Sequence, residues 1–232
     1  MRLLVTRPEP EATRTAERLR ALGHEPVIAP MLETVFLDPK LPAIDPAAIL
    51  VTSLNGVRSL TRWTLPAGWF ALPVLAVGDR TAEAARDAGF RDVRSADGDG
   101  EALATLAIAS LDPKRGPLFY PAATDRAGNW PDRLIAAGFT VRLVEAYRMD
   151  PVTNLADSVV TALREETIDG ILAYSPRTAS TLSRALKAVQ PPLPLADVAF
   201  YALSPNVAAA LDFDRVLAAN EPTEDALLAL IG

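Results

Sequence analysis

Short runs of apolar residues recur along the chain, and most are apolar nearly throughout instead of alternating with polar positions. Parallel strands covered by helices on both faces give this pattern, because neither face of the strand meets water. Ten runs are predicted as strands: residues 3–6, 26–29, 49–53, 74–78, 92–95, 118–121, 141–147, 170–175, 198–203 and 215–218.

Stretches with helical periodicity separate these runs. In residues 9–22 the apolar side chains recur on one face, and Gly23 follows as a helix stop. Residues 79–88 and 132–137 repeat this arrangement, and each stretch is again followed directly by a glycine. The alternation of strands and helices predicts an α/β fold.

The chain also contains a weak internal repeat. Residues 52–57 resemble residues 174–179, since in each a buried strand ends in serine and a helix begins. Residues 76–82 resemble residues 202–208 at a similar offset of roughly 120 residues, which is the size of a domain. The strands therefore predict two similar lobes, each a parallel five-stranded sheet flanked by helices. A ligand is expected between the lobes, at the carboxyl ends of the strands.

Composition narrows the chemistry. The 232 residues include no cysteine and one histidine, His24, which excludes disulfides, thiolate metal sites and a histidine-rich metal site within this sequence. A Ser-His-Asp triad would have a single candidate histidine, and nothing in the sequence points to it. The net charge of −6 argues against a nucleic-acid partner. Without a signal peptide or an apolar stretch of membrane-spanning length, the protein is expected to be cytoplasmic and not bound to a membrane.

Polar side chains gather where predicted strands pass into helices. A hydroxyl at such a position accepts a backbone N–H and caps the helix, and this structural role explains each serine or threonine taken alone. Several helix N-termini beside arginines would also form a binding site for an anion. We therefore expect substrate-binding residues among these positions: Arg7, Ser53, Asn55, Arg80, Thr81, Arg126, Ser175, Arg177, Ser204 and Asn206.

For the other charged residues and loops the sequence predicts no ligand-binding role. Arginines inside predicted helices, Arg18 and Arg133 among them, are expected on solvated faces. Residues 97–100, Asp-Gly-Asp-Gly, lack the ligand spacing of a calcium loop and are interpreted as a plain loop. No glycine-rich phosphate motif follows the first strand, so dinucleotide binding is unsupported.

Six motifs, in chain order, resemble those of the uroporphyrinogen-III synthase family. The sequence departs from the family pattern at two places. Residues 204–208 lack the glycine and the threonine of the family's second Gly-x-x-Thr-Ala turn, and the polar turn at residues 121–126 is looser than the usual glycine-containing form. The motifs are Val5-Thr6-Arg7-Pro8, residues 52–57, residues 77–82, the set Val141, Val144, Tyr147 and Arg148, then Ser175-Pro176, and residues 222–227.

The resemblance implies an architecture and a reaction. One lobe would combine residues 1–34 with 150–232, the other would hold residues 36–147, and a two-stranded ladder near residues 34–37 and 145–150 would join them. The implied enzyme is a lyase of tetrapyrrole (haem) biosynthesis that cyclises hydroxymethylbilane to uroporphyrinogen III, with inversion of ring D and loss of water. It would need no cofactor and no metal.

The resemblance also assigns a residue and partners. Tyr147 would be the catalytic residue, its hydroxyl assisting the departure of water. The protein would be a monomer that contacts the upstream deaminase transiently. The alternative is a non-catalytic two-lobed protein that binds or senses a small anion with the same residues. A fused regulatory segment or a DNA-binding helix pair would favour that alternative, and the sequence shows neither.

Overall fold

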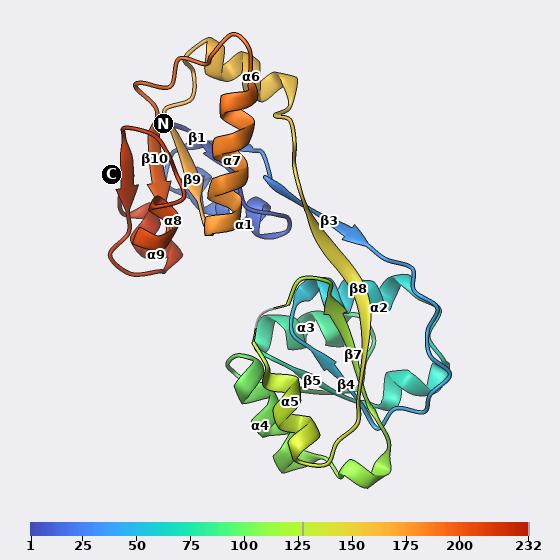
Figure 1. Ribbon diagram of the computed structural model, residues 1–232. Helices are drawn as coiled ribbons and strands as arrows, with labels where there is room; N and C mark the ends of the chain where they lie inside the picture. The colour runs from blue at the N-terminus through green and yellow to red at the C-terminus, as the bar shows by residue number, and fades with distance from the viewer. Residues whose placement is uncertain (127, 232) are drawn as a thin grey trace. The chain divides into compact units, whose positions relative to one another are not determined.

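The computed structural model describes residues 1–126 and 128–231, which form two units (Figure 1). The first unit holds both ends of the chain, up to Glu33 and from Asp150 onward. The second unit runs from Thr34 to Met149.

Unit 1 contains a parallel sheet in the order β11-β10-β9-β1-β2. Its strands are β1 (Arg2–Val5), β2 (Glu25–Ile28), β9 (Gly170–Ala173), β10 (Ala199–Ala202) and β11 (Val216–Ala218). Its helices are α1 (Glu11–Ala21), α6 (Asp157–Arg164), α7 (Pro176–Ala188), α8 (Pro205–Ala208) and α9 (Glu224–Leu228).

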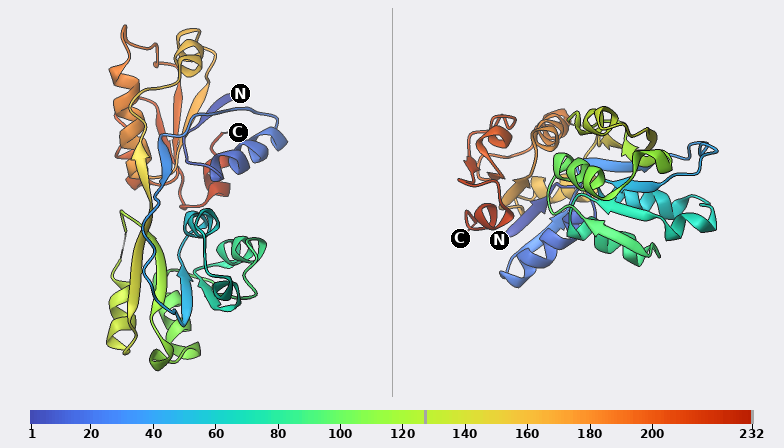
Figure 2. Two further views of the ribbon diagram at one scale, coloured as in Figure 1. Left: turned by 90° about the vertical axis from the view of Figure 1, so that its right-hand side faces the viewer. Right: turned by 90° about the horizontal axis from the view of Figure 1, so that it is seen from below.

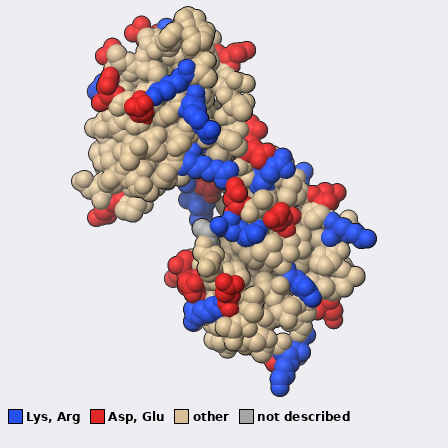
Figure 3. Space-filling view, in the orientation of Figure 1, with Lys and Arg blue, Asp and Glu red and all other residues tan. Residues whose placement is uncertain are grey.

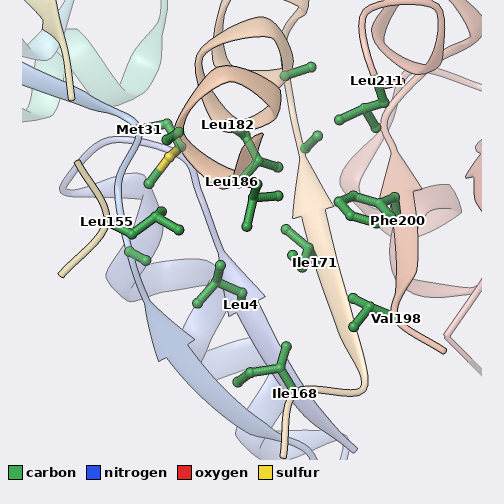
Figure 4. Packing of buried hydrophobic residues seen from close by; sticks show 14 of the residues in the cluster. Leu4, Met31, Leu155, Ile168, Ile171, Leu182, Leu186, Val198, Phe200 and Leu211 are labelled. Atoms are coloured by element: carbon green, nitrogen blue, oxygen red, sulfur yellow. The ribbon is translucent and has the colours of Figure 1, made fainter. Parts of the chain in front are cut away.

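Both faces of this sheet are covered. Leu4, Ile171 and Phe200 pack against helix α7 and its neighbours, and Figure 4 shows Leu182 and Leu186 of α7 lying over them. The alternate strand residues, such as Leu3 and Leu172, pack with α1 and α9 on the opposite face. Burial on both sides explains why the strands are apolar throughout.

Unit 2 contains a sheet in the order β3-β8-β7-β4-β5-β6. Its strands are β3 (Leu32–Phe36), β4 (Ala48–Val51), β5 (Pro73–Ala76), β6 (Asp92–Ser95), β7 (Leu118–Ala123) and β8 (Val141–Pro151). Its helices are α2 (Leu54–Arg62), α3 (Asp79–Asp87), α4 (Gly100–Ser110) and α5 (Trp130–Ala136), with short 3-10 turns at Ala67–Ala71 and Pro113–Arg115. Helices α2 and α3 cover one face and α4 and α5 the other (Figure 2).

The chain passes between the units twice, in β3 and β8, and these strands are neighbours in the sheet of unit 2. The Leu37 N–H donates to the Ala146 carbonyl at 2.9 Å, and the Val152 N–H donates to the Met31 carbonyl at 3.0 Å. The residue numbers rise on one strand as they fall on the other, so this pair is antiparallel. Together β3 and β8 form the two-stranded ladder.

The predicted fold class is confirmed, because the described residues form two helix-flanked sheets, one of five parallel strands and one mixed sheet of six. The sixth strand is β3, which adds to the parallel set through β8. Six predicted strands extended one or two residues too far at their carboxyl ends, among them the two that included Ser53 and Ser175. Ser53 and Ser175 keep extended backbones, but they cap the next helix instead of pairing in the sheet.

Charge is mixed on the surface. The face shown in Figure 3 carries both basic and acidic side chains, and most of its surface is uncharged. None of the described helices is long and apolar enough to cross a membrane.

The close approach of β9 and β10 in unit 1 generates a stability prediction. A Cβ at Gly170 would lie 2.6 Å from Tyr201 Cε2 and 3.1 Å from the Ala199 carbonyl oxygen. We expect Gly170→Ala to destabilise the protein by about 1–3 kcal/mol, because backbone cannot yield as a side chain can. Gly68→Ala is the control, since a Cβ there meets nothing within 4 Å. Equal melting temperatures for the two variants would contradict this packing.

Candidate functional site

Strands β4, β5 and β7 of unit 2 are parallel, so their carboxyl ends meet at one edge of the sheet. A pocket of about 390 Å³ opens at this edge. Three of the predicted site residues line it: Ser53, Arg126 and Tyr147. Its other walls come from the strand ends and from the starts of α4 and α5, through Thr52, Val77, Gly98, Asp99, Gly100, Tyr120, Ala123, Asp125 and Trp130.

Tyr147 and Ser53 are hydrogen-bonded to each other. Ser53 caps α2, because its Oγ accepts the Gly56 N–H at 3.1 Å, and the same Oγ lies 2.8 Å from the Tyr147 hydroxyl. Either hydroxyl can be the donor in this bond, and in one of the two arrangements the Ser53 hydrogen is donated to the tyrosine oxygen. The Tyr147 O–H is then left to donate to a ligand in the pocket.

Burial keeps Tyr147 protonated. Its side chain is 7% exposed, and this burial raises the pKa of the phenol above its usual value, while the Ser53 hydrogen bond opposes the rise only in part. A neutral phenol is a hydrogen-bond donor and a weak acid. Tyr147 is therefore a donor across the neutral pH range.

A second tyrosine, which sequence reasoning missed, stands in the same pocket. The Tyr120 hydroxyl lies 3.2 Å from Thr52 Oγ1, and its ring packs edge-on against Trp130 with ring centroids 5.0 Å apart. Tyr120 lies within the apolar run of β7, so the hydrophobic pattern marked it as core. Tyr120 is the third of the six residues of β7, and only the structure shows that its hydroxyl reaches the pocket.

Arg126 and Asp99 are two charged residues that line the pocket, and each is held by hydrogen bonds to the backbone. The Arg126 guanidinium donates to the Ala123 carbonyl at 2.7 Å and lies 3.4 Å from Glu145 Oε1. Asp99 caps α4 by accepting the Glu101 and Ala102 N–H groups at 2.9 and 3.1 Å. The loop at residues 97–100 is thus a helix cap that also lines the pocket.

Three other predicted residues of unit 2 do not line this pocket. Asn55 donates through Nδ2 to Thr34 Oγ1 at 3.2 Å, and Arg80 is exposed on the first turn of α3. Thr81 is buried inside α3, whose N-cap is Gly78. The expectation that its hydroxyl caps the helix is wrong, because the chain enters α3 three residues earlier than that role requires.

The predicted residues of unit 1 stand at the carboxyl ends of its strands. Ser175 and Ser204 cap α7 and α8, accepting the Thr178 N–H at 3.1 Å and the Val207 N–H at 3.4 Å. Each cap is followed by a proline in the first turn, as the sequence predicts. Arg177 and Asn206 are exposed on the first turns of these helices.

Arg7 is held inside unit 1 by a carboxylate of its own chain. Its Nη1 lies 3.1 Å from Glu224 Oε1 and 3.3 Å from Thr15 Oγ1, and its guanidinium carbon lies 4.2 Å from the centroid of the Tyr174 ring. Thr15 also donates to Glu224, and so does the Tyr174 hydroxyl at 3.2 Å. Burial raises the pKa of Tyr174 to about 12, so this hydroxyl stays a donor.

Arg18 completes this network. Its guanidinium lies 2.8 Å from Glu224 Oε2 and also pairs with Asp225. Arg18 lies on a partly solvated face as expected, with its side chain 40% exposed, and it also pairs with two carboxylates that the return of the chain in α9 brings against α1. Sequence reasoning missed Glu224, since more than two hundred residues separate it from its partners in α1.

No group of three or more histidine, cysteine, aspartate or glutamate residues in the described part of the chain is arranged to hold a metal ion. The groups that the pocket offers are phenol, hydroxyl, guanidinium and carboxylate. The phenol, hydroxyl and guanidinium groups donate hydrogen bonds and can bind a carboxylate, whereas the aspartate carboxylates accept hydrogen bonds.

Comparison with known proteins assigns the family. The family model described as "Uroporphyrinogen-III synthase HemD" matches residues 13–229. The chain belongs to the uroporphyrinogen-III synthase family. A search of curated proteins by sequence returned no match. The family is one of enzymes of tetrapyrrole biosynthesis, of the synthase or lyase kind, that act on a small-molecule substrate.

Solved structures of the same kind share the fold. The uroporphyrinogen-III synthetase from Helicobacter pylori is 18% identical, with a TM-score of 0.64 over 100% of this chain and 98% of that one. A mutant uroporphyrinogen-III synthase from the extremely thermophilic bacterium Thermus thermophilus is 20% identical, with a TM-score of 0.51 over 100% and 96% of the two chains. At these identities the likeness concerns the fold.

The Glu224 network predicts a pH-dependent contribution to stability. Burial alone would raise the pKa of Glu224, but bonds from Thr15 and Arg18 and the nearby charges of Arg7 and Arg18 outweigh it and hold the pKa below its usual value. The carboxylate therefore stabilises the fold above about pH 4.5, and this contribution is lost as the pH falls through the folded-state pKa. We expect Glu224→Gln to cost about 1–2 kcal/mol at pH 7.

Urea unfolding of wild type and variant at pH 7 and pH 4 measures this effect, and the difference should shrink at the lower pH. Glu101→Gln is the matched control. It breaks the exposed Arg133–Glu101 pair at 3.3 Å and should cost less than about 0.5 kcal/mol at either pH. A Glu224→Gln cost that grows on acidification would contradict the assignment of the network.

Proposed function

We propose that this protein cyclises hydroxymethylbilane to uroporphyrinogen III, with inversion of ring D and loss of one water. The observation that carries the proposal is the Tyr147 phenol. It is held at 2.8 Å by Ser53 and lines a pocket at the carboxyl edge of a parallel sheet, in a chain of the uroporphyrinogen-III synthase family.

The reaction divides into steps that ask little of the protein. The carbon–oxygen bond at the hydroxymethyl end breaks as electrons move in from the pyrrole, and water leaves with a proton that Tyr147 supplies. The resulting azafulvene cation is attacked by the substituted carbon of the far pyrrole, which gives a spiro intermediate. That intermediate fragments and recloses with ring D inverted, and the proton lost on closure restores the phenol.

The pocket supplies groups suited to these steps. The neutral Tyr147 phenol can protonate or hydrogen-bond the leaving oxygen, which is a contribution of order 10²–10⁴ in rate. Carboxylates of Asp99 and Asp125, which line the same pocket, favour the cation that forms when water leaves. Holding the two ends of the substrate together can contribute about 7–11 kcal/mol in favourable cases.

Several roles stay predictions. Arg7, Arg80, Arg126 and Arg177 are proposed to contact substrate carboxylates, which requires Arg7 to exchange Glu224 for a ligand. Hydroxyl and amide side chains are proposed to do the same: Ser53, Asn55, Thr81, Ser175, Ser204 and Asn206. We also propose a cofactor-free reaction, a monomeric protein and a transient contact with the deaminase that makes the substrate.

Product analysis of wild type and Tyr147→Phe tests the function. Supplied with hydroxymethylbilane, wild type should form isomer III, whereas the uncatalysed reaction yields isomer I. Tyr147→Phe keeps the ring but loses the donor, so turnover should fall tenfold or more, about 1.4 kcal/mol in the barrier. The isomer I fraction should then rise, because spontaneous closure competes with the slowed enzyme.

Thermal unfolding of Tyr147→Phe controls for damage to the fold, and its melting temperature should lie close to that of wild type. A variant with full rate and only isomer III would make Tyr147 a structural residue. A wild type that binds hydroxymethylbilane and yields only isomer I would refute the synthase function and favour the small-anion binding or sensor alternative.

A further inference from the structure

The pocket of unit 2 holds two phenols that reach one edge from opposite faces of the sheet. Tyr147 packs in the core cluster beneath α2 and α3, and Tyr120 packs in the cluster beneath α4 and α5. Their hydroxyls bond to consecutive residues after β4, Ser53 at 2.8 Å and Thr52 at 3.2 Å. The end of one strand therefore holds both phenols in place.

The ring of Tyr120 is fixed by its surroundings. It is 3% exposed and packs edge-on against Trp130. Trp130 in turn lies against Gly100, where an added Cβ would stand 2.4 Å from the indole Cδ1. This close contact sets the tyrosine ring between strand and helix, so its hydroxyl has little freedom of direction. A fixed donor is a group that can select a ligand orientation.

Two donors of this pocket, the Tyr120 phenol and the Arg126 guanidinium, suit an anionic ligand group. Burial raises the pKa of this phenol, the nearby Tyr147 adds to the rise and the Arg126 guanidinium opposes it. Tyr120 is thus a neutral hydrogen-bond donor that interacts electrostatically with the Arg126 guanidinium. Asp99, an acidic neighbour in the pocket, is occupied by two N–H groups of α4. Asp125, which also lines the pocket, has interactions of its own.

We infer that Tyr120 and Arg126 together bind one side-chain carboxylate of the tetrapyrrole substrate and so determine which pyrrole ring lies against Tyr147. This inference rests on the proposed function. A phenol and a guanidinium that share one carboxylate act through binding and orientation, whereas Tyr147 acts on the leaving oxygen. Tyr120 is therefore a specificity residue, distinct in effect from the catalytic tyrosine.

Steady-state kinetics of Tyr120→Phe with hydroxymethylbilane tests the inference. The variant keeps the ring against Trp130, so KM should rise about tenfold or more, as for loss of a hydrogen bond to a charged group, while kcat stays within about twofold. Tyr201→Phe is the matched control, because this buried tyrosine belongs to unit 1. The charges that act on its hydroxyl are those of Asp169 and Arg215, which precede β9 and β11 and therefore lie at the amino ends of these strands. Its KM should not change.

Substrate analogues separate recognition of a carboxylate from a structural role. In a series of hydroxymethylbilanes, each would carry a methyl group in place of one side-chain carboxylate. The penalty of Tyr120→Phe should vanish for the analogue that lacks the bound carboxylate and persist for the others. An equal penalty across the whole series would mean that the hydroxyl serves only the bond to Thr52, and would overturn the inference.

Arg126→Gln supplies a second variant that does not depend on the core. It should show the same analogue dependence, and combining it with Tyr120→Phe should raise KM by less than the product of the single effects, because both contact one group. Unchanged KM values in an active enzyme that forms isomer III would overturn the inference and leave the proposed function standing. A wild type that forms no isomer III would remove both.

Discussion

Burial of the strands on both faces is the constraint on which the rest of this structure depends. Residues of β4 have no exposed surface, and those of β9, of β10 and of β5 after Pro73 are buried as well. Such strands admit no charged side chain along their length, because an unpaired charge cannot be buried there. Polar chemistry is thereby confined to the strand ends, and parallel pairing places the carboxyl ends of neighbouring strands together.

The two units use this edge differently. In unit 2 the edge stays open as a pocket, and its hydroxyls bond in pairs, Tyr147 with Ser53 and Tyr120 with Thr52. In unit 1 the chain supplies its own anion, because Glu224 from α9 forms a salt bridge with Arg7, which follows β1. The edge of unit 2 thus carries an open pocket, whereas Arg7 at the edge of unit 1 is paired within the chain. Ser53 is central to the open site, since one oxygen caps α2 and holds the proposed proton donor.

The fold was largely predictable because it follows from local patterns. Each predicted strand overlaps an observed one, since strands buried on both faces leave uninterrupted apolar runs. Glycines follow three of the helices, α1, α3 and α5, as the sequence predicts. The helix caps at Ser53, Ser175 and Ser204 followed from the same local chemistry. The candidate site was less predictable. Tyr147 came from resemblance to a family, and nothing in its own neighbourhood distinguishes it from a linker tyrosine.

Two kinds of information were missing from the sequence. Tyr120 belongs to an apolar run, so the hydrophobic pattern marks it as a core residue. That its hydroxyl bonds to Thr52 and reaches a pocket depends on the neighbouring strand β4, which the pattern does not show. The partnership of Arg7 with Glu224 depends on the return of the chain across the sheet, which no local pattern encodes. Both cases concern side chains that meet through the topology of the sheet.

The central claim is that a protonated Tyr147 phenol donates into a ligand-binding pocket of unit 2. Its most direct test is NMR of protein with ¹³C at tyrosine Cζ, titrated with a bilane that has a methyl group in place of the hydroxymethyl group. The account predicts that the Tyr147 resonance stays at its protonated position throughout the neutral pH range, because its pKa is raised above the usual value. The resonance should move on saturation with this unreactive ligand, while that of Tyr201 should not. A Tyr147 resonance that titrates near neutral pH, or that is unchanged in the saturated protein, would contradict the account.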